Sequence, residues 1–309
     1  MPKADLQPAN DSGRARRRAW WQLIRPPNLF TVPGDPLAGF VVAGLLAPQV
    51  PAWHLAVLPM LAALWLYVGG LIGNDVADEA EDRRDRPTRP IPSGRISRRA
   101  AWWAAAFCGA CGLLLAGAAG WRTLLAAAFT QGAILAYNGG LKRRLVAGSL
   151  AMGACRGGSL LLGAVAAGGD VAGGLVIAAV AGVTLYIAGV TALADRETVA
   201  VRLGVRRWVP LAAVVGVGVA VGWWVHPAPR AALWLLGGAA LWAGYQAWRL
   251  RGVPPPALVG PSIGALIRGL LLVQAGLCAL GGVPGLLLAA VLLALWPLST
   301  ATARRFYAS

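Results

Sequence analysis

The stretch Asn74-Asp75-Val76-Ala77-Asp78-Glu79-Ala80-Glu81-Asp82-Arg83-Arg84-Asp85-Arg86-Pro87-Thr88-Arg89 directly follows an apolar run over residues 55–72. That run is long enough to cross a membrane. The chain has 12 acidic residues in all, and half of them fall in this one stretch. Charged groups beside a membrane are costly and are usually functional. We therefore expect a functional site where the apolar run ends.

The spacing of these acids predicts a metal site. If the helix continues past Gly73, then Asn74, Asp78 and Asp82 stand four residues apart on one face, with Asp75 close to it. Carboxylates so close repel one another, and a bound divalent cation removes that cost. Oxygen-only ligands suit Mg²⁺, which commonly bridges to substrate phosphates. A solvated loop that only sets membrane topology would explain the neighbouring arginines but not the acids.

The arginines after the acids are suited to bind diphosphate oxygens in pairs. Prolines stiffen this loop and Gly94 allows a turn. Acids and arginines together predict a metal–diphosphate site at a membrane surface.

Composition indicates a polytopic helical membrane protein. Hydrophobic residues make up 58% of the chain and charged residues only 13%. We expect a disordered basic tail over residues 1–22, followed by a single domain over 23–309. The net charge of +16 does not indicate a nucleic-acid partner, because the basic residues fall in clusters between apolar runs. The partner that these clusters predict is a lipid bilayer, and the oligomeric state stays open.

The apolar runs predict an all-α transmembrane bundle of nine to ten helices. The expected spans are roughly 29–46, 53–74, 99–119, 121–139, 148–167, 172–194, 208–226, 230–249, 260–281 and 284–301. Segment 260–281 is the doubtful one, because Arg268 lies near its middle and a re-entrant path is an alternative. Every second span ends in arginines or lysines, which places the N-terminus in the cytoplasm and predicts a multi-pass protein of the bacterial inner membrane.

Two charged residues inside the apolar segments need partners. Arg156 lies among glycines, and we expect an Asp or a diphosphate to pair with it. Snorkelling to the membrane surface is the alternative. Asp35 has three alternatives: it pairs with Arg156, it pairs with Arg268, or it acts as a base.

The pattern Asn74-Asp75-x-x-Asp78-x-x-x-Asp82 resembles the first aspartate-rich motif of the UbiA superfamily of intramembrane prenyltransferases. The loop Arg86-Pro87-Thr88-Arg89-Pro90-Ile91-Pro92-Ser93-Gly94 is similar to that family's loop. The resemblance implies a helical bundle, usually of nine helices, with catalysis on the cytoplasmic side and Mg²⁺ as cofactor.

The resemblance extends to three further segments. Arg25-Pro26-Pro27-Asn28 looks like the family's first-helix start, where an Arg-Pro and an Asn line the cavity. Tyr137 to Lys142 looks like the segment whose basic residue reaches the diphosphate. Asp195 stands where a second aspartate motif is expected, although Val199 replaces its second acid.

The resemblance implies a site of three overlapping groups. The metal ligands are Asn74, Asp75, Asp78, Asp82 and Asp195. The diphosphate-binding residues are Arg25, Asn28, Arg89, Lys142 and Arg156. The catalytic residues are Asp78, Asp82, Arg156 and Asp195.

The implied function is transfer of an isoprenoid group from a Mg²⁺-bound prenyl diphosphate to an unidentified acceptor, either aromatic or a polyol or lipid precursor. A membrane terpene cyclase of the same superfamily is one alternative. A non-catalytic isoprenoid or lipid carrier is another, favoured by the incomplete second motif.

Overall fold

The computed structural model describes residues 9–47, 52–197 and 199–306, and within these ranges the chain forms helices and turns with no strand. The predicted all-α class is thus confirmed. The long helices are α1 (Ala9–Ile24), α3 (Gly34–Gly44), α4 (Val57–Ala77), α6 (Arg98–Ala119), α7 (Trp121–Asn138), α8 (Leu145–Ala166), α9 (Gly174–Ala194), α10 (Val209–Trp224), α11 (Arg230–Arg249), α12 (Pro256–Cys278) and α13 (Gly282–Phe306). Short helical segments are α2 (Pro26–Leu29), α5 (Glu79–Asp85), η1 (Trp53–Ala56), η2 (Leu141–Arg143), η3 (Gly204–Trp208) and η4 (Ala279–Gly281).

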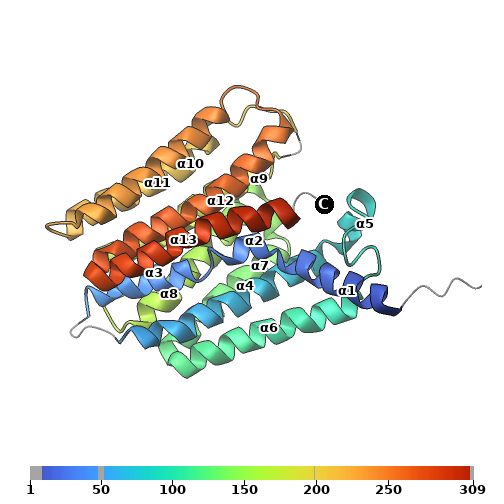
Figure 1. Cartoon of the computed structure of the whole chain (residues 1–309), viewed down its shortest axis with the longest axis horizontal. Helices are drawn as coiled ribbons and strands as arrows, with labels where there is room; N and C mark the ends of the chain where they lie inside the picture. Colours follow the sequence, from blue (N-terminus) through green and yellow to red (C-terminus); the bar gives the residue numbers. More distant parts are fainter. Residues whose placement is uncertain (1–8, 48–51, 198, 307–309) are drawn as a thin grey trace, which may run out of the picture.

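The long helices form one bundle, with α6 along one edge and the α10–α11 hairpin along the opposite edge (Figure 1). Large apolar side chains such as Phe107, Leu114 and Trp234 are exposed on the outer faces of these edge helices. Such a surface suits lipid rather than water, since soluble proteins rarely expose broad apolar patches. The fold is that of a multi-pass membrane protein.

Each of the ten expected spans coincides with a helix in the described part of the chain. Segment 260–281 belongs to the continuous helix α12, which packs against α3, α9, α11 and α13. Among the residues that the structure describes, six stretches are long and apolar enough to cross a membrane: Trp53–Ala77, Arg98–Ala119, Leu145–Ala166, Gly174–Ala194, Gly204–Trp224 and Pro256–Arg304. The number of crossings, nine or ten, therefore stays a prediction.

The N-terminal region differs from the expected disordered tail over residues 1–22. From Ala9 onward the chain is helical in α1, and residues 1–8 lie outside the described residues. Ala19 and Leu23 are fully buried against the ends of α4 and α6. Two apolar positions four residues apart give α1 one buried edge, while its arginines face outward. The many arginines of residues 14–18 hide this short apolar pattern in the sequence.

Helix α8 is the centre of the bundle and packs against α3, α7 and α9. Its contact with α3 depends on two glycines. A Cβ added at Gly163 would overlap the Pro36 carbonyl oxygen, and one at Gly39 would overlap the Leu160 carbonyl oxygen. Small residues let membrane helices approach closely. This approach brings the start of α3 beside the middle of α8.

Candidate functional site

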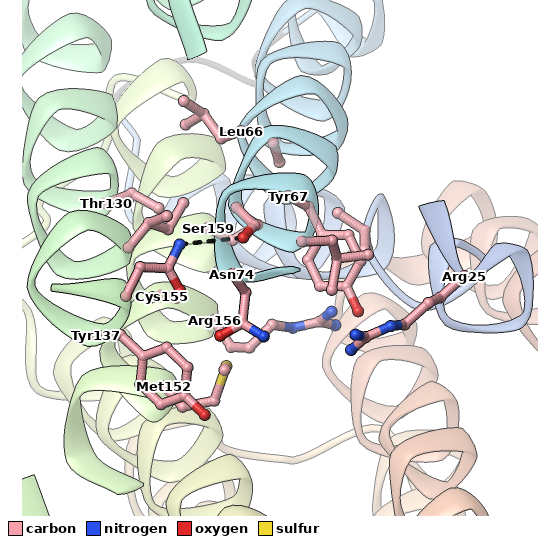
Figure 2. A pocket seen from close by; sticks show the side chains of 16 residues that line it. Arg25, Leu66, Tyr67, Asn74, Thr130, Tyr137, Met152, Cys155, Arg156 and Ser159 are labelled. Atoms are coloured by element: carbon pink, nitrogen blue, oxygen red, sulfur yellow. Dashed lines mark hydrogen bonds between the residues drawn. The ribbon is translucent and has the colours of Figure 1, made fainter. Parts of the chain in front are cut away.

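A cavity opens between α4, α7 and α8, with contributions from Arg25 and Val32 (Figure 2). Most of its wall is apolar, and its polar residues include Asn74, Asn138 and Arg156. The lining residues are Arg25, Val32, Ala63, Leu66, Tyr67, Gly70, Leu71, Asn74, Thr130, Ile134, Tyr137, Asn138, Met152, Cys155, Arg156 and Ser159.

One group of ion pairs lies beside Arg25 at the mouth of this cavity. Arg25 Nη2 is 2.6 Å from Asp75 Oδ1, and Arg89 Nη1 donates to Asp82 Oδ2 at 2.7 Å. Arg89 Nη1 is also 3.9 Å from Asp75 Oδ1, so the four side chains form one network. The Asp75 and Asp82 side chains are each only 6% exposed. Carboxylates this buried need the cations that face them.

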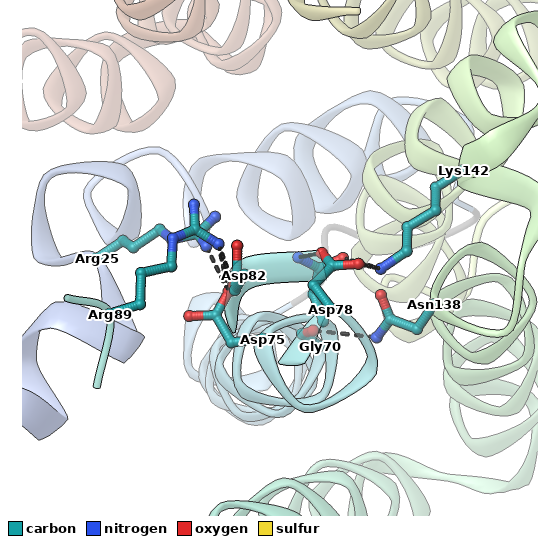
Figure 3. Close-up of polar contacts among 9 residues, drawn as sticks. Arg25, Gly70, Asp75, Asp78, Asp82, Arg89, Asn138 and Lys142 are labelled. Atoms are coloured by element: carbon teal, nitrogen blue, oxygen red, sulfur yellow. Dashed lines mark hydrogen bonds and ion pairs between the residues drawn. The ribbon is translucent and has the colours of Figure 1, made fainter. Parts of the chain in front are cut away.

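A second group lies on the other side of the same helix end (Figure 3). Asn74 Nδ2 donates to Asp78 Oδ2 at 2.9 Å, and Lys142 Nζ donates to Asn74 Oδ1 at 3.0 Å. Lys142 also forms an ion pair with Asp78. Across the two groups, three carboxylates face three cationic side chains, so the formal charges at the mouth cancel.

The acids are grouped differently from the expectation. Asp82 lies with Asp75 rather than with Asp78, because residues seven apart share a helix face as well as residues four apart. Helix α4 ends at Ala77 and α5 begins at Glu79, but the backbone bonds Asp78 N to Asn74 O (2.9 Å) and Asp82 N to Asp78 O (2.8 Å) carry the helical path through the junction.

Arg25 is held in a strained conformation. It separates α1 from α2 with φ 51° and ψ 65°, and it is the one non-glycine residue with positive φ among the described residues. Pro26 disfavours the right-handed helical conformation for the residue before it. The left-handed conformation costs a residue with a Cβ roughly 1–2 kcal/mol. This bend directs the Arg25 side chain into the cavity, and such strain is common at functional sites.

The loop over residues 86–97 positions Arg89. Its backbone is closed by bonds from Ser93 N to Arg89 O (3.0 Å) and from Ile96 N to Pro90 O (3.1 Å). Ile91 and Ile96 are buried in the same apolar cluster as Ala19 and Leu23 of α1. The loop is therefore fixed to α1 and to the end of α4.

A third polar cluster is buried beneath the mouth. Arg156 Nε lies 2.6 Å from Asp35 Oδ2, and Arg156 Nη2 donates to the Thr31 carbonyl oxygen at 2.8 Å. Gln274 Nε2 of α12 donates to Asp35 Oδ1 at 2.6 Å. The expected pairing of Asp35 with Arg156 is present in the structure. The Arg156 guanidinium also lies over the Tyr67 ring, 5.9 Å from its centroid.

Two predicted site residues lie apart from this arrangement. Asn28 does not line the cavity, and its carbonyl oxygen accepts a bond from Thr31 Oγ1. Asp195, at the end of α9, is 41% exposed and pairs with its neighbour Arg196. Because its ion-pair partner is the adjacent Arg196, the part of Asp195 in the site stays a prediction.

The predicted metal ligands are present but engaged. In the described ranges no three His, Cys, Asp or Glu residues are gathered as a ready metal site. Each carboxylate at the mouth instead contacts an Arg or Lys. The donor chemistry of Asn74, Asp75, Asp78 and Asp82 still fits Mg²⁺, which takes oxygen ligands. Holding the ion there requires these side chains to exchange their cationic partners.

Tyr67, Thr31 and Gln274 were not predicted from the sequence to contact the site. Tyr67 and Gln274 are isolated polar residues inside strongly apolar runs. That isolation is itself a signal, because a polar group within a membrane needs a partner. In α12 the charge of Arg268 is the more conspicuous feature of the sequence.

The fold and the site define an α-helical membrane protein with a cavity that is apolar along its wall and charged at its mouth. The model of the UbiA prenyltransferase family matches residues 37–255, and the chain belongs to this family. The resemblance in the aspartate-rich stretch is thereby confirmed at the level of the family.

Curated relatives match the chain over part of its length. A digeranylgeranylglyceryl phosphate synthase of Methanothrix thermoacetophila is 36% identical over 148 residues, which cover 47% of this chain and 54% of the relative. One of Thermococcus gammatolerans is 33% identical over 154 residues, 49% of this chain and 54% of the relative. The chain spans about half the length of the curated relatives it matches.

Solved structures share the fold. A UbiA homologue from Aeropyrum pernix K1 has a TM-score of 0.64 at 22% identity, covering 82% of this chain and 97% of that one. A UbiA homologue from Archaeoglobus fulgidus, described as bound to GPP and Mg²⁺, has a TM-score of 0.61 at 18% identity, covering 86% and 100%. At these identities the likeness concerns the fold alone.

Proposed function

We propose that this protein is a prenyltransferase that moves an isoprenoid group from a Mg²⁺-bound prenyl diphosphate to a lipid acceptor. One observation supports this proposal most directly. The apolar cavity opens at a mouth where three carboxylates contact three cationic side chains. A prenyl diphosphate has the complementary form, since an apolar chain ends in a highly charged head group.

The cations at the mouth bind the diphosphate. Arg25 and Arg89 offer planar guanidinium groups, which suit pairs of phosphate oxygens, and Lys142 offers a compact charge from the opposite side. Asn74, Asp75, Asp78 and Asp82, released from these cations, would hold the metal. Bound Mg²⁺ supplies neutralisation of the charge that develops on the diphosphate leaving group.

Arg156 provides a further fixed positive charge on the cavity wall. The buried Asp35 carboxylate and the Thr31 carbonyl oxygen hold its guanidinium in place. A charge held in place before reaction stabilises a leaving group without reorganisation. In this proposal Arg156 faces the diphosphate, and Asp35 and Gln274 position Arg156.

The acceptor we propose is a glyceryl phosphate lipid. The curated relatives are named digeranylgeranylglyceryl phosphate synthases, and the chain matches about half of their length. We further propose that residues 23–309 form a single domain, with the cavity mouth and the N-terminus on the cytoplasmic side. The arginines of the 83–99 region favour this orientation.

The test is diphosphate release by purified protein in lipid nanodiscs with Mg²⁺ and geranylgeranyl diphosphate. The assay is run with and without geranylgeranylglyceryl phosphate or an aromatic acceptor. Asp78→Asn and Asp82→Asn are compared with Glu81→Gln, which changes an adjacent exposed acid whose side chain forms no ion pair with the described residues. We expect the two aspartate variants to lose at least about a hundredfold in rate, while Glu81→Gln keeps it.

Each outcome separates the candidate functions. Release that needs the glyceryl phosphate lipid supports the proposed transfer. Release without any acceptor indicates a cyclase, and release with the aromatic compound alone indicates a different acceptor class. Equal rates for Asp78→Asn, Asp82→Asn and the unchanged protein would refute the metal–diphosphate site. No release by folded protein favours a carrier.

A further inference from the structure

A second charged groove lies on the surface beside the proposed site. One wall is α1, with Arg14, Arg18 and Gln22, and the other is the 86–97 loop, with Thr88, Ser93 and Arg95. It is separate from the cavity, whose mouth holds Arg25 and Arg89. The two walls are fixed to each other, because Leu23, Ile91 and Ile96 share one buried cluster.

The groove presents donors and positive charge. Arg14 and Arg18 are exposed, and no ion pair joins Arg14, Arg18 or Arg95 to an acid among the described side chains. The Arg95 side chain is held by its own loop, since its Nε donates to Ser93 Oγ at 3.0 Å. The Ser93 hydroxyl already donates to the Pro90 carbonyl oxygen at 3.3 Å. The three guanidinium groups and the Thr88 hydroxyl favour an anion that accepts several hydrogen bonds, as a phosphate group does.

Tryptophans locate this groove at the depth of lipid head groups. Trp21 of α1 and the neighbouring Trp102 and Trp103 of α6 are all more than half exposed, at 52%, 52% and 58%. Tryptophans concentrate where a membrane meets water. Helices α1 and α6 share the buried cluster of Ala19 and Ala101, so these indoles and the groove belong to one end of the bundle (Figure 1).

We infer that this groove binds the phosphate of an anionic membrane lipid. A soluble phosphate compound would meet the same arginines, but it would leave the exposed indoles beside them unused. A lipid supplies both an anion for the arginines and apolar chains for the indoles, because its phosphate reaches the groove while its chains remain in the bilayer beside Trp21. Lysines and arginines next to a membrane commonly bind anionic head groups in this way.

The test compares two double variants of the full-length protein. Arg14→Gln with Arg18→Gln removes two charges that line the groove. Arg16→Gln with Arg17→Gln removes two exposed charges from the same helix that do not line it. Native mass spectrometry measures retained phosphatidylglycerol in detergent micelles at increasing lipid concentration. Phosphatidylcholine is the uncharged comparison, and inorganic phosphate is the soluble competitor.

We expect the groove variant to weaken phosphatidylglycerol binding by about tenfold or more, while the control variant binds as the unchanged protein does. An equal loss in both variants would mean general surface charge and would overturn the inference, as would no loss in either. Displacement of the lipid by millimolar inorganic phosphate would overturn the assignment to lipid. Thermal unfolding of both variants checks that each is folded, and prenyl transfer is not needed for any readout.

Discussion

At the scale of single residues, Lys142 joins the two polar groups that face it, the Asp78 carboxylate and the Asn74 amide oxygen. Because we propose that Lys142 binds the diphosphate, we expect Lys142→Gln to raise the KM for prenyl diphosphate by about thirtyfold, since a hydrogen bond to a charged group contributes about 1.5–3 kcal/mol. Steady-state kinetics measure this change.

The control for that prediction is the next residue. Arg143 carries the same charge, is exposed and forms no ion pair with the part of the chain that the structure describes, so Arg143→Gln should leave the KM unchanged. Equal effects of the two substitutions would show that Lys142 acts only through the charge of the surface.

The buried pair of Asp35 and Arg156 predicts strong coupling between two substitutions. Asp35→Asn alone should lower the free energy of unfolding by about 3–5 kcal/mol, since it leaves a buried charge without its partner. In an Arg156→Gln background the same substitution should cost far less. Unfolding in mixed micelles by denaturing detergent measures all four proteins of the cycle, and additive costs would contradict the pairing.

At the scale of helices, the crossing of α3 and α8 holds Asp35 beside Arg156. Gly163→Ala should destabilise the protein by about 1–3 kcal/mol, because the added methyl group meets the backbone of Pro36. The matched control is Gly132→Ala on α7, where an added Cβ meets nothing within 4 Å. We expect that control to change stability by less than about 1 kcal/mol. Equal losses of stability would show that the crossing tolerates the extra methyl group.

The positions of the helices could be predicted from the sequence because apolar runs of about 20 residues carry that information. The partners of the charged side chains inside those helices could not be predicted. Arg156 had Asp35 or a diphosphate as candidates and Asp35 also had Arg268, and the choice depends on which helices are neighbours. The glycines at the α3–α8 crossing allow these two helices to contact each other through their backbones, which brings Asp35 to Arg156. The pattern of charges in the sequence does not reveal this contact.

The acids at the end of α4 illustrate the same limit. Their presence and approximate spacing were visible in the sequence, but both four-residue and seven-residue spacings fit one helix face. The positions of the cations determine which acids are grouped together. Arg25 and Arg89 contact Asp75 and Asp82 on one side of the helix end, and Lys142 contacts Asp78 on the other. Those cations come from segments before and after α4, so their approach is a tertiary property.

At the scale of the whole molecule, membrane orientation is the remaining prediction from charge. We expect a cysteine at Arg84→Cys to be closed to an impermeant maleimide in right-side-out vesicles. A cysteine at Asp170→Cys, in the exposed turn between α8 and α9, should react. Labelling before and after permeabilisation, in a background without the native cysteines, measures both. The opposite pattern would place the cavity mouth outside the cell.

The balance of charge at the cavity mouth bears on the search for inhibitors. A purely anionic head group meets the three carboxylates as well as the three cations, and without a metal ion it gains little. A zwitterionic head group can replace one Arg–Asp ion pair, with its anionic end bound to the Arg and its cationic end bound to the Asp. The remaining ion pairs then stay in place. For the metal-free state of the mouth, compounds with a zwitterionic head group on an apolar chain are therefore a better starting point than phosphonates.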